Sequence, residues 1–165
     1  MKSNTKLITD HNIKTSFNKL NYNIKTSFNK LNSNDNDLIY DGIFEISLYL
    51  YANNKLNMSV GTITFNELLN WQSSSARSGV WTYYEVAKME NMIITKNYLK
   101  DNKNVDIYDI YSYGIHDYNN ASDNDINKWV DESDIIDDWL NRNEILVMNY
   151  LKNLLFILEK EILNI

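Results

Sequence analysis

The chain has 165 residues, 44% of them hydrophobic and 13% aromatic, so it can bury the core of one domain and is not expected to be disordered throughout. It contains no Cys, which excludes disulfides, thiolate nucleophiles and sulfur-ligated zinc and fits a cytoplasmic protein. Its formal net charge is −6. No apolar stretch approaches the roughly 20 residues that span a bilayer, and no signal-peptide pattern opens the sequence, so we expect no transmembrane segment.

Charge is distributed unevenly along the chain. Residues 1–33 hold six Lys and one Asp, a net charge of +5, whereas residues 34–165 hold ten basic and 21 acidic residues, a net charge of −11. We therefore predict a basic N-terminal arm at 1–33 and an acidic helical domain at 34–165. An acidic domain repels nucleic acid and attracts basic proteins or cations, so direct nucleic-acid binding by residues 34–165 is not expected.

The arm contains an internal repeat. The phrase NIKTSFNKLN occupies residues 12–21 and again residues 23–32, with Tyr22 between the two copies. Its apolar residues are spaced four, three, four, four and three apart, at Ile13, Phe17, Leu20, Ile24, Phe28 and Leu31. This spacing indicates a helical stripe, and the eleven-residue period keeps both copies on one helical face. Because Asn, Thr and Ser are poor helix formers, we expect the arm to be either flexible or a helix docked on another surface.

The next elements are predicted from periodicity and capping residues. Residues 36–52 are predicted as a helix whose buried face is Ile39, Ile43, Ile46 and Leu50, with Asp35 or Asn36 as N-cap. A strand over 45–51 (EISLYLY) is the alternative. Residues 59–65 (SVGTITF) favour a short extended piece, and Thr64 with Glu67 resembles a capping box before a short helix at 65–71. Residues 72–79 (QSSSARSG) are typical of a loop.

The following segment is harder to assign. Residues 80–99 are predicted as one helix with Val86, Met89 and Ile93 facing inward, although a strand followed by a helix is an alternative. Residues 101–121 contain Asn, Asp and Gly and are predicted as an irregular connection.

The C-terminal third has the clearest helical pattern. Residues 126–140 are predicted as one or two short helices, and residues 143–164 as a long one. The long helix has Val147, Leu151, Leu154, Leu158 and Ile162 in register, and its stripe is widened by Leu146, Tyr150, Phe156 and Ile157. A stripe that wide is typical of a helix packed on several neighbours. The predicted fold is therefore mainly α: a small single-domain helical bundle with a long, central C-terminal helix, a short β element near 59–65, and α+β as the alternative.

The most acidic stretch contains a possible cation site. Residues 123–134 (DNDINKWVDESD) resemble a degenerate EF-hand calcium loop, although Lys128 replaces its invariant glycine and an Asp replaces its final Glu. The matching metal ligands are Asp123, Asp125, Asn127, Asp131 and Asp134. This resemblance implies calcium as the one candidate cofactor. The favoured interpretation is an N-capped helix with a solvated acidic face, for which no cofactor is expected.

Two weaker patterns concern anions and catalysis. Ser75, Arg77 and Ser78 supply hydroxyls and a guanidinium ahead of a predicted helix, so they are candidate anion-binding residues. The stretch lacks the glycines and the Lys of a phosphate loop. His11 and His116 are the two histidines, and neither has neighbours in the sequence that indicate a catalytic residue.

The charge pattern favours a binding protein over an enzyme. We expect a non-enzymatic binding or inhibitor protein whose acidic surface engages a basic protein such as a toxin or nuclease, as immunity proteins and DNA mimics do. The candidate partner-binding residues are Trp129, Asp131, Glu132, Asp134, Asp137, Asp138 and Trp139. The alternatives are a small carboxylate- or cation-dependent hydrolase and a calcium-binding module at 123–134.

Overall fold

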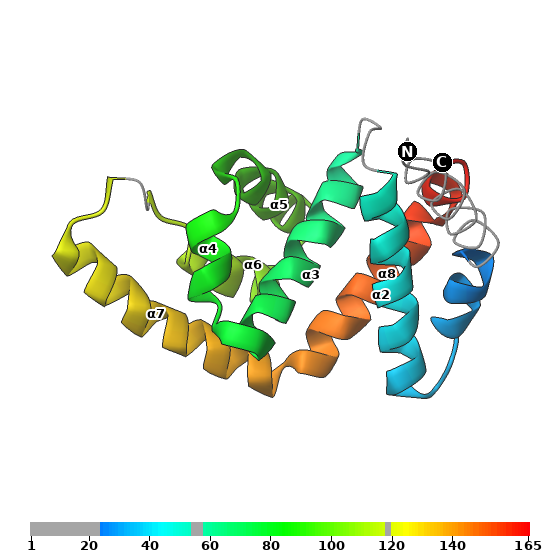
Figure 1. Ribbon diagram of the computed structural model, residues 1–165, viewed down its shortest axis with the longest axis horizontal. Coiled ribbons are helices and arrows are strands. Elements are labelled where there is room, and N and C mark those ends of the chain that lie inside the picture. The colour runs from blue at the N-terminus through cyan, green and yellow to red at the C-terminus, as the bar shows by residue number, and fades with distance from the viewer. Residues whose placement is uncertain (1–23, 54–57, 118–119) are drawn as a thin grey trace, which may run out of the picture. The chain divides into compact units, whose positions relative to one another are not determined.

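The computed structural model of the chain describes residues 24–53, 58–117 and 120–165 (Figure 1). All regular secondary structure within these residues is helical. A helical segment at 24–30 precedes α2 (Asn36–Ala52), α3 (Val60–Ser78), α4 (Trp81–Val86), α5 (Met89–Asp101), α6 (Val105–Tyr113), α7 (Asp123–Arg142) and α8 (Glu144–Ile162). The prediction of a mainly α fold with a long C-terminal helix is confirmed, and the α+β alternative is not supported.

Contacts divide the chain into two compact units. The first comprises the described residues up to 53 together with 156–165, and the second comprises the described residues between 58 and 155. α8 therefore contributes residues to both units. The helical segment at 24–30 belongs to the same unit as α2, so the second copy of the repeat is grouped with a helix of the predicted acidic domain. The first copy lies outside the described residues.

In the first unit the second repeat copy packs against α2. Leu31 is fully buried, and Ile24 and Phe28 are nearly so. The backbones approach closely at Gly42, where a Cβ would lie only 2.8 Å from the Ser27 carbonyl oxygen. Residues 24–30 can form a helix although several are poor helix formers, because burial of their stripe supplies the stability that propensity does not.

α2 itself follows its predicted pattern. Asp35 is the N-cap, and its carboxylate accepts a hydrogen bond from the Asp37 backbone N–H. The four residues of the predicted inward face, Ile39, Ile43, Ile46 and Leu50, are all buried.

In the second unit α3 replaces two predicted elements. The extended piece expected at 59–65 is wrong, because Ser59 caps a helix by accepting a hydrogen bond from the Thr62 N–H at 3.2 Å. The loop expected at 72–79 is also wrong, since α3 continues to Ser78 and ends at Gly79, whose φ of 90° suits glycine. A capped helix start and burial of Phe65, Leu68 and Trp71 along one face outweigh the local β propensity of this stretch.

The region after α3 forms three short helices in place of one helix and a connection. The chain is extended at Ala87 and Lys88, so the predicted helix at 80–99 is divided into α4 and α5. Val86 is 77% exposed rather than inward. Met89 and Ile93 are also exposed, and α5 instead buries Met92, Thr95 and Leu99. Residues 105–113, predicted as irregular, form α6 behind an Asn104 cap.

Of the two C-terminal helices, α7 is longer than expected, and α8 buries a narrower face than expected. α7 is one continuous helix of 20 residues. In α8 the five residues predicted in register are all buried, but Leu146 and Ile157 are exposed, and Met148 and Leu155 take their place. Of the helices that the structure describes, none is both long and apolar enough to cross a membrane.

An aromatic cluster lies at the core of the second unit. α3 contacts α4, α5 and α7, and α6 contacts α5 and α7 (Figure 1). Trp71 of α3 and Tyr111 of α6 meet edge to face with ring centroids 5.4 Å apart, and Tyr83 and Tyr84 of α4 meet at 5.1 Å. Such aromatic pairs add to the stability that their burial provides.

We predict that Gly114→Ala strongly destabilises the protein. A Cβ at Gly114 would lie 2.3 Å from the Tyr84 ring and 2.9 Å from Ile136. Tyr84 cannot move aside cheaply, because it is buried and its hydroxyl donates a hydrogen bond to the Tyr111 carbonyl at 2.8 Å. Overpacking should lower the free energy of unfolding by about 1–3 kcal/mol or more in urea denaturation. Val86→Ala, at an exposed site nearby in the second unit, is the control, and an equally stable Gly114→Ala protein would contradict the packing.

Candidate functional site

The acidic segment from 123 onward is an N-capped helix. The Ser122 hydroxyl accepts a hydrogen bond from the Asp125 N–H, and the Asp125 carboxylate accepts one from the Ser122 N–H at 3.0 Å. Hydrogen bonds from the Ser122 hydroxyl and backbone lower the pKa of Asp125. Carboxylates in a first turn are also favoured by the positive end of the helix dipole. The segment therefore starts as a stable helix.

This geometry differs from that of the resembled calcium loop. Residues two positions apart on an α-helix are turned by about 200°, so the Asp125 side chain points to the side of α7 opposite Asp123 and Asn127, and the three do not surround an ion. Asp131 and Asp134 lie further along the same helix. In the described part of the chain, no group of three or more His, Cys, Asp or Glu side chains is placed to hold a metal ion. The favoured interpretation, a capped helix with a solvated acidic face, matches the structure of this segment.

The predicted partner-binding residues separate into two groups. Asp131, Asp134 and Asp138 are exposed, and their spacing of three and four residues places them on one face of α7. We call these three residues the acidic face. Glu132 is buried and Asp137 is partly buried, so these two carboxylates point toward the protein. The two tryptophans are partly buried as well.

Asp137 binds the junction between α3 and α4. Its carboxylate accepts a hydrogen bond from the Ser75 hydroxyl and another from the Val80 backbone N–H at 2.9 Å. A Cβ at Gly79 would lie 3.3 Å from this carboxylate, so glycine leaves room for it. The segment predicted to bind an anion through Ser75, Arg77 and Ser78 thus holds a carboxylate of the same chain. Arg77 is exposed, and the Ser78 hydroxyl hydrogen-bonds to that of Thr82.

Glu132 binds the segment that precedes α7. The His116 ring donates a hydrogen bond from Nε2 to the Glu132 carboxylate at 2.6 Å, and the Lys128 Nζ lies 3.5 Å from the other carboxylate oxygen. The same ring stacks on Trp129, with centroids 4.6 Å apart and planes 5° from parallel. Stacking on Trp129 therefore sets the plane of the His116 ring, and the hydrogen bond to Glu132 sets its rotation within that plane.

A small pocket of about 250 Å³ lies beside His116. It is lined by Tyr84, Glu85, Ala87, Met89, Met92, His116 and Asp117. A histidine oriented by a carboxylate is an arrangement that general bases use. Here, however, the Tyr84 hydroxyl is engaged with the Tyr111 carbonyl, and the volume is below the roughly 300 Å³ at which ligand pockets begin. The His116–Glu132 pair therefore fits a role in holding residues 114–117 against α7 better than a catalytic role.

Sequence reasoning missed a second buried carboxylate network, at the centre of the second unit. Glu67 of α3 accepts a hydrogen bond from the Tyr83 hydroxyl at 2.7 Å and one from the Asn91 amide at 2.9 Å. The hydroxyls of Tyr83 and Tyr111 hydrogen-bond to each other. Burial is the main cause that raises the pKa of Tyr83 and of Tyr111 above the ordinary tyrosine range. These partners lie 16 to 28 residues apart, so no local sequence pattern could have identified them.

Comparisons with known proteins add no further assignment. No family model matches the chain, and no match is found among curated proteins or solved structures.

We predict that two neighbouring aspartates of α7 differ sharply in their contribution to stability. Asp137→Ala leaves the Ser75 hydroxyl and the Val80 N–H without their acceptor, which should cost about 1–3 kcal/mol of unfolding free energy. Asp138 is 77% exposed and only 3.9 Å from Arg142 in an exposed ion pair, so Asp138→Ala should change the free energy by less than about 0.5 kcal/mol. Urea denaturation of the two variants is the measurement, and equal effects would contradict the assignment of Asp137.

We also predict a loss of stability at alkaline pH. Burial raises the pKa of Tyr150 to about 12, whereas an unfolded tyrosine ionises near pH 10. Above about pH 10 the folded state therefore holds a proton that the unfolded state releases. The free energy of unfolding then falls as the pH rises, and each such group contributes up to about 1.4 kcal/mol per pH unit to this fall. Urea denaturation from about pH 8 to about pH 11 should show this fall. Tyr150→Phe should reduce the slope, and Tyr113→Phe, at an exposed site, should not.

Proposed function

We propose that the protein is a non-enzymatic binding protein whose acidic face on α7 engages a basic protein. The observation that supports this most is the division of the α7 carboxylates. Glu132 and Asp137 are occupied by partners within the chain, whereas Asp131, Asp134 and Asp138 point into solvent from one face. Glu132 and Asp137 stabilise the fold through their partners. The exposed carboxylates of the acidic face do not have this role, so they are accessible to another molecule.

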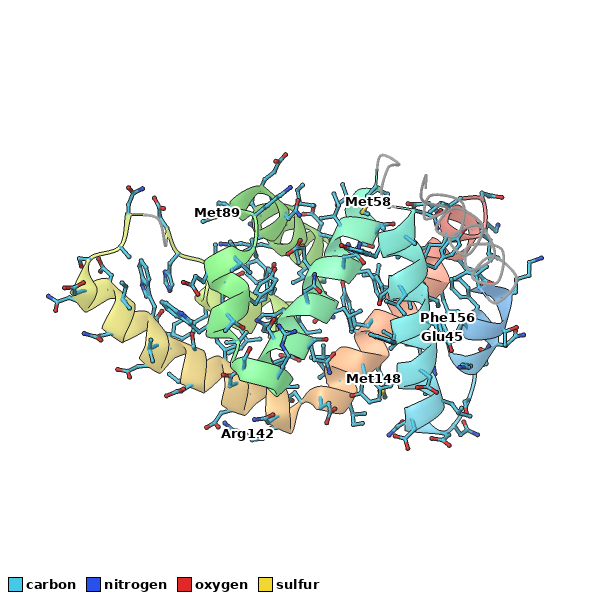
Figure 2. All side chains as sticks on the ribbon, in the orientation of Figure 1. Glu45, Met58, Met89, Arg142, Met148 and Phe156 are labelled. Atoms are coloured by element: carbon cyan, nitrogen blue, oxygen red, sulfur yellow. The ribbon has the colours of Figure 1, made fainter. Side chains whose placement is uncertain are left out.

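Exposed apolar side chains lie beside the acidic face, as in the interfaces between proteins. Ile135, 54% exposed, and the exposed Val130 lie on α7 beside the three aspartates and offer apolar contact. Arg142 forms an ion pair with Asp138 of the acidic face; the pair is exposed to solvent, and its nitrogen and oxygen atoms are 3.9 Å apart. Figure 2 labels Arg142 near the end of α7. Exposed ion pairs of this kind contribute little, so a Lys or Arg of a partner can replace Arg142 at low cost.

The spacing of the charges indicates the class of partner. Residues 131 to 138 span about 10.5 Å of helix axis at about 1.5 Å per residue, which gives one carboxylate per roughly 5 Å. A DNA strand presents one phosphate per about 3.4 Å. The acidic face is thus a short row of negative charges, more widely spaced than the phosphates of a DNA strand, and a basic surface that binds nucleic acid carries charges of the opposite sign to it. We propose a nuclease or toxin of this kind as the partner, with the chain acting as an immunity-type or DNA-mimic-type neutraliser.

Charge reversal of the acidic face should abolish partner capture. The variant combines Asp131→Lys, Asp134→Lys and Asp138→Lys, which raises the formal net charge from −6 to zero. Wild-type protein immobilised at low salt should retain a basic protein and release it steeply as salt rises, because exposed charges are screened. The triple variant should not retain it. The bound protein is identified by mass spectrometry, and its nuclease activity is then assayed with and without the wild-type chain.

A matched control carries the same change of charge elsewhere. Glu90→Lys, Asp101→Lys and Asp106→Lys alter three exposed carboxylates of α5 and α6 and also bring the formal net charge to zero. This control should retain the partner as the wild type does. Equal loss in both triple variants would show a non-specific charge effect, and equal retention in both would exclude the acidic face.

A further inference from the structure

We propose that the surface of α2 that binds the second repeat copy is also a binding site for the first copy, residues 12–21, so that the two copies exchange on one site within the chain. This inference concerns the first unit alone and is independent of the acidic face on α7.

The site on α2 is defined by contacts to the second copy. Glu45 accepts hydrogen bonds from the Ser27 hydroxyl and from the Lys30 ammonium, both at 2.7 Å, and Asp41 lies 3.9 Å from the same ammonium. At Gly42 the side chain of Leu31 comes within 3.0 Å of where a Cβ would stand. We call Asp41, Gly42 and Glu45 the copy-binding site; Figure 2 labels Glu45.

Electrostatics and shape both contribute to this site. The hydrogen bond from Lys30, together with that from Ser27, lowers the pKa of Glu45 against the opposing effect of its burial. The absence of a side chain at Gly42 permits close backbone approach, with 2.8 Å between the Ser27 carbonyl oxygen and a Cβ built there. The site therefore recognises a short helix with a serine, a lysine and an apolar residue at fixed spacing.

The first copy carries the same residues at the same spacing. Every side chain of the second copy that is buried or bonded at the site recurs eleven residues earlier, at Ile13, Ser16, Phe17, Lys19 and Leu20. Eleven residues are close to three helical turns, so the recognition face is identical in both copies. The contacts available to the first copy are consequently the same ones that hold the second.

The two occupied states differ mainly in the length of the connection to α2. Three residues, 33–35, join the second copy to the start of α2, whereas fourteen residues, 22–35, join the first copy to it. The probability of closing a loop falls as about the three-halves power of its length, which disfavours the longer connection by roughly tenfold. The second copy is therefore the major occupant, as in the structure, and the first copy is the minor one at about one molecule in ten.

Cross-linking tests the exchange directly, because the chain has no Cys of its own. In the full-length double variant Lys30→Cys/Asp41→Cys, a short bifunctional thiol reagent should join the two residues rapidly. In Lys19→Cys/Asp41→Cys it should join them within one chain more slowly, by about tenfold or more, because this variant also lacks the lysine with which the first copy would bind Glu45. Lys19→Cys/Tyr51→Cys measures random encounters, since Tyr51 is exposed and ten residues away from Asp41 along α2.

The expected result is a rate for Lys19→Cys/Asp41→Cys clearly above that of the Tyr51 control. Equal rates in these two variants would overturn the proposal. Cross-links that form only between chains would also overturn it, because they would assign the first copy to α2 of a second molecule.

A thermodynamic test uses the redundancy of the copies. Phe28→Ala in the full-length chain should lower the ratio of folded to unfolded protein by only about tenfold, since the first copy then occupies the site. Deletion of residues 22–32 gives a chain with one copy directly before Ser33, and deletion of residues 12–22 gives the identical sequence. In that single-copy chain no second copy can replace the one that carries Phe17→Ala. The ratio of folded to unfolded protein should therefore fall by roughly a hundredfold or more.

The controls make this test decisive. The single-copy chain itself should be about as stable as the full-length chain, because its remaining copy makes the same contacts. Phe17→Ala in the full-length chain should have no effect. If the phenylalanine substitution costs the same at Phe28 in the full-length chain as in the single-copy chain, the first copy does not use the site.

Discussion

The second unit depends on one constraint, which is that a carboxylate taken out of water must receive hydrogen bonds. An unpaired buried charge costs several kcal/mol, so each such group fixes the groups around it. Glu67 gathers Tyr83 and Asn91. Asp137 ties α7 to the junction of α3 and α4, and Glu132 ties α7 to His116. Each of the three joins elements that are distant in sequence, and Asp137 and Glu132 orient α7 against its neighbours in this unit.

The same constraint decides what α7 presents to solvent. A helix that turns Glu132 and Asp137 inward to their partners must turn the residues on its opposite side outward. Asp131, Asp134 and Asp138 occupy that side. The acidic face is therefore a consequence of how the inward carboxylates are satisfied, and it is as rigid as those hydrogen bonds make α7. A rigid row of charges loses little conformational freedom when it binds, which favours recognition of a complementary surface.

The helices with strong apolar periodicity could be predicted from the sequence, and the interactions between helices could not. The stripes of α2 and α8 were identified because burial of one face every three to four residues leaves a local pattern. The prediction of a β element at 59–65 was wrong, because the Ser59 N-cap and the burial of Phe65 favour a helix against the local β propensity. For the candidate site, composition located the acidic residues but did not separate Asp137 from Asp138. That distinction depends on Ser75, which lies 62 residues away from Asp137. Ser75 and Asp137 were predicted to bind two different external molecules and instead bind each other.

The repeat shows how a duplication can be accommodated at a packed site. A duplication of eleven residues inside a core element usually displaces every residue that follows it from its contacts. Here the copy nearest to α2 keeps the three-residue connection and all of its contacts, because the duplicated unit is identical and the additional length lies upstream of residue 23. The eleven-residue period further keeps one recognition face through both copies. The requirement is only that the unit next to Ser33 present Ser, Phe, Lys and Leu in the right order, so tandem copies of this phrase are tolerated.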